Sequence, residues 1–225
     1  MKPIHTLFGL LIALLLPGAG VADSSGGGGM SGPSMPAVQR SPEALAQDYY
    51  KQGVKHKKRA WRQEERALEE DSEKGRDKRL ARAQREYKKA ISEYNRALGL
   101  NPRLYLAMNE LGYALRKTGD YPTAVRAYNS ALRLKPDFSQ AIEYRGEAFL
   151  ALGLLEETKD AYMSLFRLER EQADKLMAAM QAWIQEQRAA DADTEVLSEF
   201  EQWVAERNEL AGQNQSLSMN NARHW

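Results

Sequence analysis

The chain has 225 residues, a formal net charge of +1 and no cysteine. The absence of cysteine excludes disulfide bonds, thiolate metal sites and cysteine nucleophiles. If the N-terminal segment described next is removed, about 200 residues remain, which is enough for one ordinary domain without disulfide support.

The N-terminus has the three-part layout of a secretory signal peptide. Lys2 supplies the positive start, residues 7–16 form an unbroken apolar run, and Pro17 is followed by small residues up to Ala22. The layout predicts that 1–22 is a signal peptide cleaved after Ala22, and that the protein is periplasmic or secreted. The apolar run is shorter than the about 20 residues of a spanning helix, so we expect no membrane span after cleavage. An uncleaved signal that stays as an anchor is the alternative.

The composition changes after the signal. Residues 23–41 are rich in Gly, Ser and Pro, which predicts a flexible linker. Residues 40–100 contain 17 Lys and Arg against 11 Asp and Glu, whereas residues 156–210 contain 6 against 14. Because basic and acidic residues alternate, we interpret both stretches as solvated helix faces. Export also argues against nucleic acid as a partner of the basic stretch.

Order is predicted to begin at Ser41. Ser can cap a helix, Pro42 suits its first position, and Glu43 complements the positive helix end. From there to about Leu210 the apolar residues recur every three or four positions, and no stretch alternates with a period of two. The pattern predicts an all-α fold.

Similar residues recur at a distance of 34 along the chain. The recurring pairs are Gly112 with Gly146, Gly119 with Gly153, Tyr128 with Tyr162, Tyr94 with Tyr128, and Pro102 with Pro136. A fixed period of this length is typical of stacked helix pairs.

This pattern resembles the tetratricopeptide repeat. Residues 105–138 match the family's order of Leu-Gly, aromatic, Ala, aromatic, Ala and Pro almost fully. Residues 139–172 match less well, because Thr158 replaces the small Ala and Arg145 replaces the Leu, so we expect looser packing or a wetter edge there. The resemblance implies about three antiparallel helix pairs and a role in binding proteins.

The first repeat, residues 42–104, departs most from the pattern. Gly53 precedes Ala90 by 37 residues, whereas the complete repeat has a distance of 12 between the corresponding positions. The extra segment is rich in Lys, Arg and Glu but keeps an apolar stripe. We predict that both helices are prolonged into a protruding hairpin, roughly 30 Å long, with its turn at residues 73–76. A disordered charged loop is the alternative, although Trp61 favours the hairpin.

Two further helical segments follow the repeats. Residues 173–210 place apolar side chains, including Trp183 and Trp203, on one face of each segment. We interpret them as a cap that covers the last repeat, because a solenoid needs such a terminal element. The polar residues 211–225 predict a mobile tail.

The sequence contains no constellation typical of an enzyme. Of three histidines, His5 lies in the signal, His56 lies among lysines and His224 lies in the tail. There is no helical metal-ligand pair and no phosphate-binding glycine loop. Carboxylates such as Glu64 and Glu65 could pair as acid and base, but on an exposed charged hairpin we interpret them as solvated charges. We therefore predict no catalysis, no metal and no cofactor.

The resemblance implies a binding surface. In the family the first helix of each pair lines the concave side, and its side chains commonly contact a peptide or a partner helix. The predicted partner-binding residues are Leu106, Asn109, Tyr113, Arg116, Lys117, Gln140, Glu143 and Glu147. Some relatives grip a terminal carboxylate with a Lys/Asn/Arg set. Glu143 and Glu147 occupy positions where that set would need cationic or neutral groups, so we expect no such clamp here.

Three functional hypotheses remain. The first is a periplasmic adaptor or scaffold that holds a protein or peptide partner in its concave groove. The second is a self-assembling structural envelope protein, a homo-oligomer in which the basic hairpin of one chain docks on the acidic C-terminal helices of another. The third, an enzyme, would need an unforeseen site between the capping helices. The sequence does not name the partner.

Overall fold

The computed structural model describes residues 40–191 and 194–222, with side chains as far as Gln213. The predicted signal peptide 1–22, and all but the last two residues of the predicted linker 23–41, lie outside the described residues. The described residues form eight helices and no strand, which confirms the all-α fold. The helices are α1 (Pro42–Leu68), α2 (Glu73–Leu100), α3 (Tyr105–Lys117), α4 (Tyr121–Leu134), α5 (Ser139–Ala151), α6 (Leu155–Leu168), α7 (Arg170–Ala189) and α8 (Glu195–Ala222).

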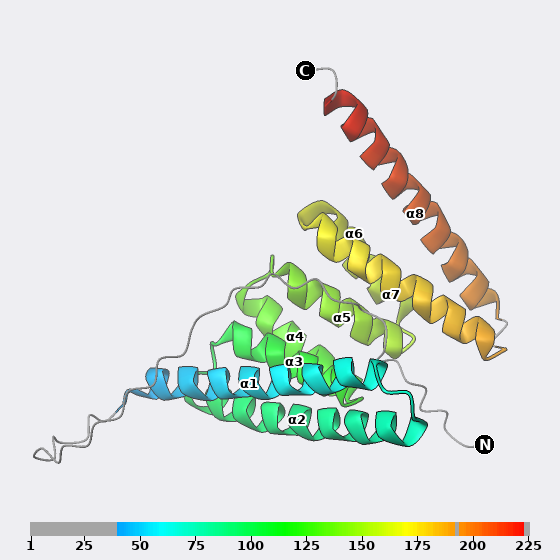
Figure 1. Cartoon of the computed structure of the whole chain (residues 1–225). Helices are drawn as coiled ribbons and strands as arrows, with labels where there is room; N and C mark the ends of the chain where they lie inside the picture. The colour runs from blue at the N-terminus through cyan, green and yellow to red at the C-terminus, as the bar shows by residue number, and fades with distance from the viewer. Residues whose placement is uncertain (1–39, 192–193, 223–225) are drawn as a thin grey trace, which may run out of the picture.

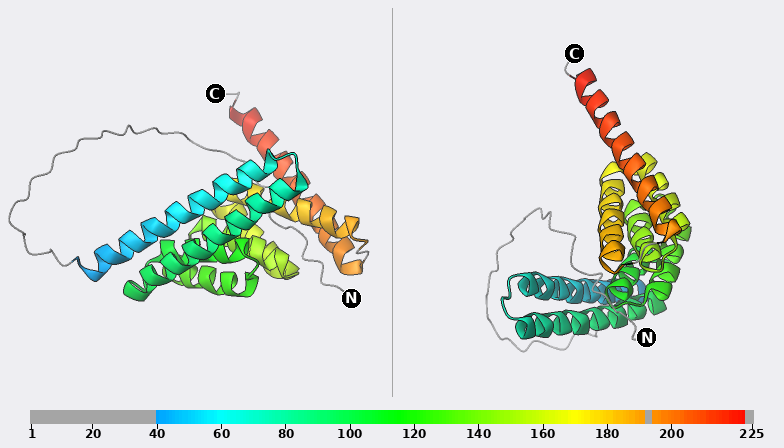
Figure 2. Two further views of the ribbon diagram at one scale, coloured as in Figure 1. Left: turned by 60° about the horizontal axis from the view of Figure 1, so that its bottom comes forward. Right: turned by 90° about the vertical axis from the view of Figure 1, so that its right-hand side faces the viewer.

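The helices follow one another as antiparallel pairs in a curved stack (Figures 1 and 2). Helices α1, α3, α5 and α7 contact one another in series, and each even-numbered helix packs against its odd-numbered neighbours. The odd-numbered helices therefore form the inner layer of the stack. The α1–α2 hairpin lies at one end of the array and α8 at the other (Figure 1).

The charged segment of the first repeat forms a hairpin of two long helices, not a loop. Ala60, Ala67 and Ala83 are buried where α1 and α2 meet, and small side chains of this kind allow two helices to pack closely. The turn lies at residues 69–72, so the predicted position at 73–76 was wrong. The reason is a cap, because Ser72 accepts a hydrogen bond at 3.1 Å from the backbone N–H of Gly75 and so begins α2 earlier.

The repeat glycines are required by close helix contacts. A Cβ on Gly53 would lie 2.4 Å from Cε1 of Tyr94, and a Cβ on Gly112 would lie 2.6 Å from Cε1 of Tyr128. Both tyrosine rings are fully buried, so they could not move aside. In the first two pairs, the glycine of the first helix therefore accommodates the tyrosine of the second.

The third pair buries the residue that replaces the small Ala of the repeat. Thr158 is fully buried, and its hydroxyl donates to the backbone oxygen of Leu154 at 2.9 Å. The expectation of a wetter position there was wrong, because this bond satisfies the hydroxyl within its own helix. A Cβ on Gly146 would meet Leu176 of α7 at 2.7 Å, so α7 covers the weaker repeat.

The C-terminal pair packs large aromatic side chains against the third repeat. Phe200 is buried, with Trp183 edge-on to it at 5.8 Å between ring centroids, while Trp203 lies edge-on to Tyr162 of α6 at 5.7 Å. Both tryptophans thus pack against the cluster of buried apolar residues that α5, α6, α7 and α8 form together. A cap on the last repeat requires such contacts.

Helix α8 continues to Ala222, well into the segment 211–225 that we predicted to be a mobile tail. Two contacts support its continuation. The side chain of Gln213 donates to Glu209 one turn earlier at 3.2 Å, and Arg170 donates to the backbone oxygen of Ala211 at 3.1 Å. Both contacts lie within the first three residues of the segment.

Candidate functional site

The inner face is the side on which α1, α3 and α5 meet, and α1 and α3 are joined there by three contacts in register. Lys57 forms an ion pair with Glu110, Trp61 Nε1 donates to the Tyr113 hydroxyl at 2.7 Å, and Lys117 Nζ lies 2.8 Å from Glu64 Oε1. The α1 positions are spaced i, i+4, i+7, which places them on one side of the helix. Since both sets of residues advance in the same direction, α1 and α3 run parallel.

The next interface, between α3 and α5, repeats this arrangement. Asn109 Nδ2 donates to Gln140 Oε1 at 3.3 Å, and Arg116 forms an ion pair with Glu147. Between these contacts the rings of Tyr113 and Tyr144 lie 5.1 Å apart. In each of these three pairs the α5 residue follows the α3 residue by 31 positions, so α3 and α5 pack in one register along the inner face.

Cations and aromatic rings alternate across the inner face. Lys57 Nζ lies 4.5 Å from the Trp61 ring centroid and 5.3 Å from that of Tyr113. The Arg116 guanidinium lies 5.3 Å from the rings of both Tyr113 and Tyr144. Such contacts are attractive because the ring faces carry partial negative charge. The cations therefore contribute to packing as well as to ion pairs.

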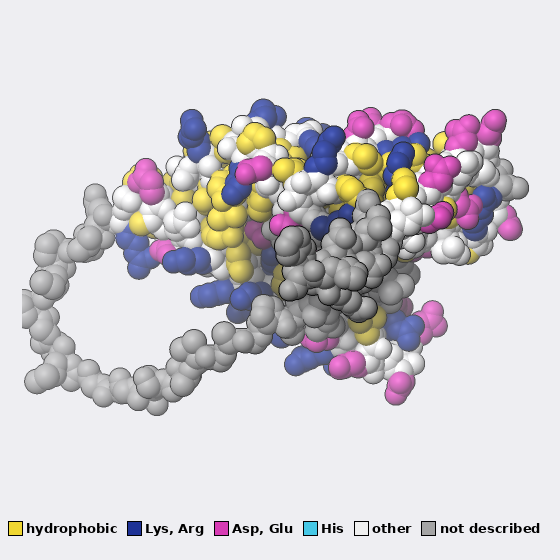
Figure 3. All heavy atoms as spheres, turned by 90° about the horizontal axis from the view of Figure 1, so that it is seen from above, with side chains coloured by type: hydrophobic (Ala, Val, Ile, Leu, Met, Phe, Trp, Pro, Cys, Tyr) yellow, Lys and Arg dark blue, Asp and Glu magenta, His cyan; other side chains and the backbone are white. Residues whose placement is uncertain are grey.

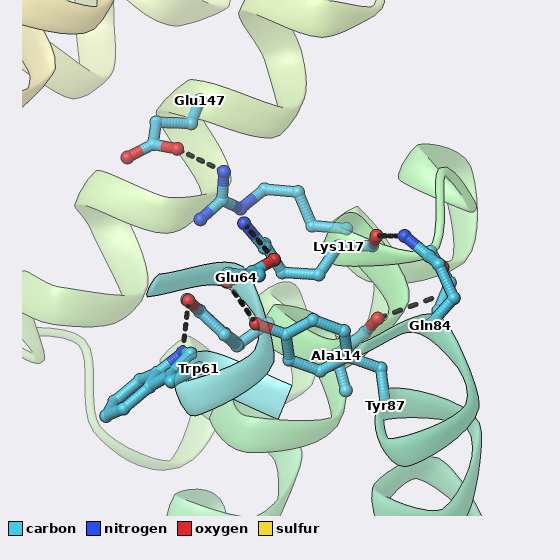
Figure 4. A network of polar contacts seen from close by, with 10 residues as sticks. Trp61, Glu64, Gln84, Tyr87, Ala114, Lys117 and Glu147 are labelled. Atoms are coloured by element: carbon cyan, nitrogen blue, oxygen red, sulfur yellow. Dashed lines mark hydrogen bonds and ion pairs between the residues drawn. The ribbon is translucent and has the colours of Figure 1, made fainter. Parts of the chain in front are cut away.

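Glu64 connects three helices (Figure 4). One of its oxygens pairs with Lys117 of α3, and the other accepts from the Tyr87 hydroxyl of α2 at 2.9 Å. Gln84 of α2 also donates to the backbone oxygen of Lys117 at 2.8 Å. Burial, with a further contribution from neighbouring Tyr113 and Glu64, raises the pKa of Tyr87, so its hydroxyl remains a donor.

Glu143 is the most deeply buried acidic side chain of the inner face, with 2% of its surface exposed. It lies one helical turn before Glu147, on the same side of α5. Burial, and next the charge of Glu147, raise the pKa of Glu143 well above its ordinary value. Glu147 is paired with Arg116, so Glu143 is the carboxyl group of the two that has no cation at ion-pairing distance among the described residues.

The structure places all eight predicted binding residues on α3 or α5, but most do not stand free. Six of them are buried or engaged in the contacts above: Asn109, Tyr113, Arg116, Lys117, Glu143 and Glu147. Their partners come from the adjacent inner helices. Leu106 is 36% exposed and Gln140 is partly buried.

Other residues of the inner face were missed in the sequence. They are Lys57, Glu64, Glu110 and Tyr144, while Trp61 was considered only as support for the hairpin. The i, i+4, i+7 spacing of Lys57, Trp61 and Glu64 was visible in the sequence. It became informative only once α1 was known to extend alongside α3.

Three large apolar side chains remain accessible on α1 and α3: Trp61, Leu106 and, at the end of α1, Leu68. Trp61 is 37% exposed and Leu106 is 36% exposed. Leu106 lies one turn before Asn109 and two turns before Tyr113, which places it on the same face of α3. Within 40–191 and 194–222, no group of three or more His, Cys, Asp or Glu side chains could hold a metal ion. In the same ranges, no helix has the length and apolar character needed to span a membrane.

The pairs, their inner layer and the 34-residue register define an α-helical repeat protein. The sequence profile of the tetratricopeptide repeat matches residues 79–137 and 109–157. Residues 79–157 are therefore similar to tetratricopeptide repeats. No curated protein matches the sequence.

Several solved tetratricopeptide domains are similar to this chain. The second such domain of human RPAP3, in complex with an HSP70 peptide, is 22% identical, with a TM-score of 0.47 over 61% of this chain and 96% of that one. The first domain of human RPAP3 is 21% identical, with a TM-score of 0.46 over 63% and 96%. A double mutant described as MamA RS-1 ArsTM is 17% identical, with a TM-score of 0.41 over 77% and 98%.

Proposed function

We propose that this protein is an exported adaptor that binds a protein or peptide partner through the exposed part of its inner face, around Trp61 and Leu106. The similarity of residues 79–157 to tetratricopeptide repeats supports the binding role, because repeats of this kind generally serve as scaffolds for protein interactions. The N-terminal layout of residues 1–22 supports export to the periplasm or beyond.

The observation that carries the proposal is the exposure of two apolar anchors on a face whose polar groups are largely satisfied internally. Trp61 and Leu106 each expose more than a third of their surface, while the intervening Tyr113 is 8% exposed. Aromatic and aliphatic side chains held on a rigid surface are the usual centres of binding energy. A network that is already formed also reduces the entropy lost when the partner binds.

The same contacts define the kind of partner. Arg116 and Lys117 are already paired with Glu147 and Glu64, so the inner face offers apolar anchors in place of a cationic grip for a carboxylate. The Trp61 N–H is engaged by Tyr113, so a partner would meet the exposed part of the indole ring. We therefore infer a partner segment with one or two large apolar side chains.

Site-specific photo-crosslinking in the living source cell tests this proposal. A photoreactive benzoylphenylalanine would replace Leu106 on α3, and in a matched strain Leu134 on α4, which is 38% exposed. We expect a discrete crosslinked partner from position 106 only, and its loss when Trp61→Ala is added. Equal crosslinking from both positions, or a product unaffected by Trp61→Ala, would contradict the proposal.

Export is tested separately by N-terminal sequencing of the protein recovered from the envelope fraction. We expect a mature chain that begins at Asp23. An N-terminus that includes residues 1–22 would instead support the anchor alternative.

A further inference from the structure

A strongly basic cleft of about 550 Å³ lies between α1 and α2. Six cationic side chains line it: Arg59, Arg62, Arg66, Arg82, Arg85 and Lys89. Its lining includes only one acid, Glu86. A cluster of this composition attracts anions, and guanidinium groups can bind a carboxylate through two parallel hydrogen bonds.

The single acid does not neutralise the cleft. Glu86 lies 2.7 Å from His56 Nδ1 and 2.6 Å from Lys89 Nζ. Although burial opposes it, hydrogen bonds from Lys89 and His56 lower the pKa of Glu86, so its charge is already matched by close neighbours. Four arginines have no carboxylate at ion-pairing distance among the described residues: Arg62, Arg66, Arg82 and Arg85.

The cations of the cleft are spaced for a helix. On α2, Lys78 precedes three lining residues at the i, i+4, i+7, i+11 spacing that marks one side of a helix: Lys78, Arg82, Arg85 and Lys89. On α1, Arg59, Arg62 and Arg66 form a parallel stripe of the same kind. A helix lying along this cleft would meet both stripes if its own carboxylates followed a similar spacing.

Helix α8 presents such a set of carboxylates. Its exposed acids are Glu195, Glu199, Glu206 and Glu209, spaced i, i+4, i+11 and i+14. The helix is buried through the opposite side, which carries Leu197, Phe200 and Val204. Figure 3 shows acidic side chains gathered toward the right-hand end of the molecule, where Figure 1 places the junction of α7 and α8.

We propose that the basic cleft between α1 and α2 receives the acidic face of α8 from a second copy of this chain. The cleft and α8 lie at opposite ends of the array (Figure 1), so the contact is head-to-tail and leads to rings or filaments. It uses neither Trp61 nor Leu106, and it stands independently of the partner proposed for the inner face. The complementary charges and the shared i, i+4, i+11 positions favour this occupant over other anions.

The contact is expected to depend on salt. Exposed ion pairs are individually weak, and dissolved ions screen them. Sedimentation equilibrium of the full chain should therefore show association that weakens about tenfold or more between roughly 0.05 and 0.5 M NaCl. A chain that is monomeric at both salt concentrations would overturn the proposal. An association constant that is the same at both concentrations would also overturn it.

Charge exchange gives the sharper test. The cleft variant carries Arg82→Glu and Arg85→Glu, and the helix variant carries Glu199→Arg and Glu206→Arg. Each variant alone brings like charges together, so we expect both to be monomeric where the unaltered chain associates. An equimolar mixture restores opposite charges at both contacts and should associate again. A mixture that stays monomeric would overturn the proposal.

Two controls separate this contact from other effects of charge. Reversing Arg126 and Arg133 on α4 to Glu changes the net charge as much as the cleft variant does, and should leave association intact. Circular dichroism of each variant would show that its helices are retained.

A separate experiment asks whether the cleft binds another anion. The probes are phosphatidylglycerol vesicles and inorganic polyphosphate. If the unaltered chain remains monomeric and binds either probe, and the cleft variant does not, the cleft is a site for another anion and self-docking is overturned.

Discussion

The two end hairpins of this array are both long, yet they are packed by opposite means. Toward the turn between α1 and α2 the buried apolar side chains are the small Ala60, Ala67 and Ala83, and Tyr87 is the first large one inward from them. Between α7 and its neighbours they are large, and Met180 and Phe200 are fully buried there. A seam of alanines brings two helices close together, whereas a core of large side chains must cover the end of the stack.

The difference in packing accompanies a difference in surface. Because the α1–α2 seam is narrow, most of each helix remains exposed, and arginines occupy that surface on both helices. Helix α8 instead buries one apolar side and presents acids on the other. The α1–α2 end thus has small buried side chains and a basic surface, whereas the α8 end has large buried side chains and an acidic surface. The predictions below test each part of that contrast.

The largest effect is expected at the C-terminal end. Phe200→Ala removes a fully buried ring from the last core cluster and should lower the free energy of unfolding by roughly 3–5 kcal/mol. Urea denaturation followed by circular dichroism measures it. Val196→Ala, on the same helix but 61% exposed, is the control and should change little. A loss below about 1 kcal/mol for Phe200→Ala would show that the cap is loosely packed.

A smaller loss is expected from overfilling the alanine seam. Ala83→Leu inserts three carbon atoms where the helices meet, which should cost about 1–3 kcal/mol. Ala81→Leu, two residues earlier on an exposed side of α2, provides the matched control. If the two variants unfold at the same urea concentration, the seam is not close-packed, and the contrast with the other hairpin fails.

Between the two ends, the buried Glu143 should make stability depend on pH. Its folded-state pKa is raised, so its favourable contribution is complete below the ordinary carboxyl pKa of 4.5 and declines as pH rises through the folded-state value. Glu143→Gln keeps the shape without the charge and should stabilise the protein near neutral pH by on the order of 1 kcal/mol. The gain should vanish near pH 4 in thermal unfolding followed over pH. Exposed Glu199→Gln should show no such trend, and a gain independent of pH would contradict this account.

The smallest effect is expected from the basic cleft. Arg62→Ala and Arg66→Ala remove exposed cations that have no carboxylate partner among the described residues, so each should alter the free energy of unfolding by less than about 0.5 kcal/mol. Denaturation at two salt concentrations would measure this. A larger loss from either variant would mean that these arginines stabilise the fold and are not available for a partner.

Sequence periodicity predicted the elements better than their contacts. The 34-residue spacing and the glycines indicated the helix pairs, because Gly53 and Gly112 each accommodate a tyrosine of the following helix. The turn of the first hairpin was misplaced because the cap formed by Ser72 outweighed Gly75 as a turn signal. Helix α8 extends further than predicted, and Gln213 bonds to Glu209 one turn earlier within it.

The inner face was the hardest part to predict. Helical spacing shows which residues share a face, but it does not show which helix that face meets. Arg116 and Lys117 looked available on α3 until the neighbouring helices supplied Glu147 and Glu64. Trp61 acquired its place only because the prolonged α1 reaches alongside α3. Such pairings depend on tertiary register, which one sequence does not specify.

The most direct test of the central claim is the affinity of the crosslinked partner segment for the unaltered protein and for Trp61→Ala, measured by calorimetry. Binding anchored on the inner face predicts a dissociation constant higher by about tenfold or more for Trp61→Ala. Leu68→Ala, two turns further along the same helix and 57% exposed, should bind like the unaltered protein. Equal affinity for all three proteins would contradict a binding site at Trp61.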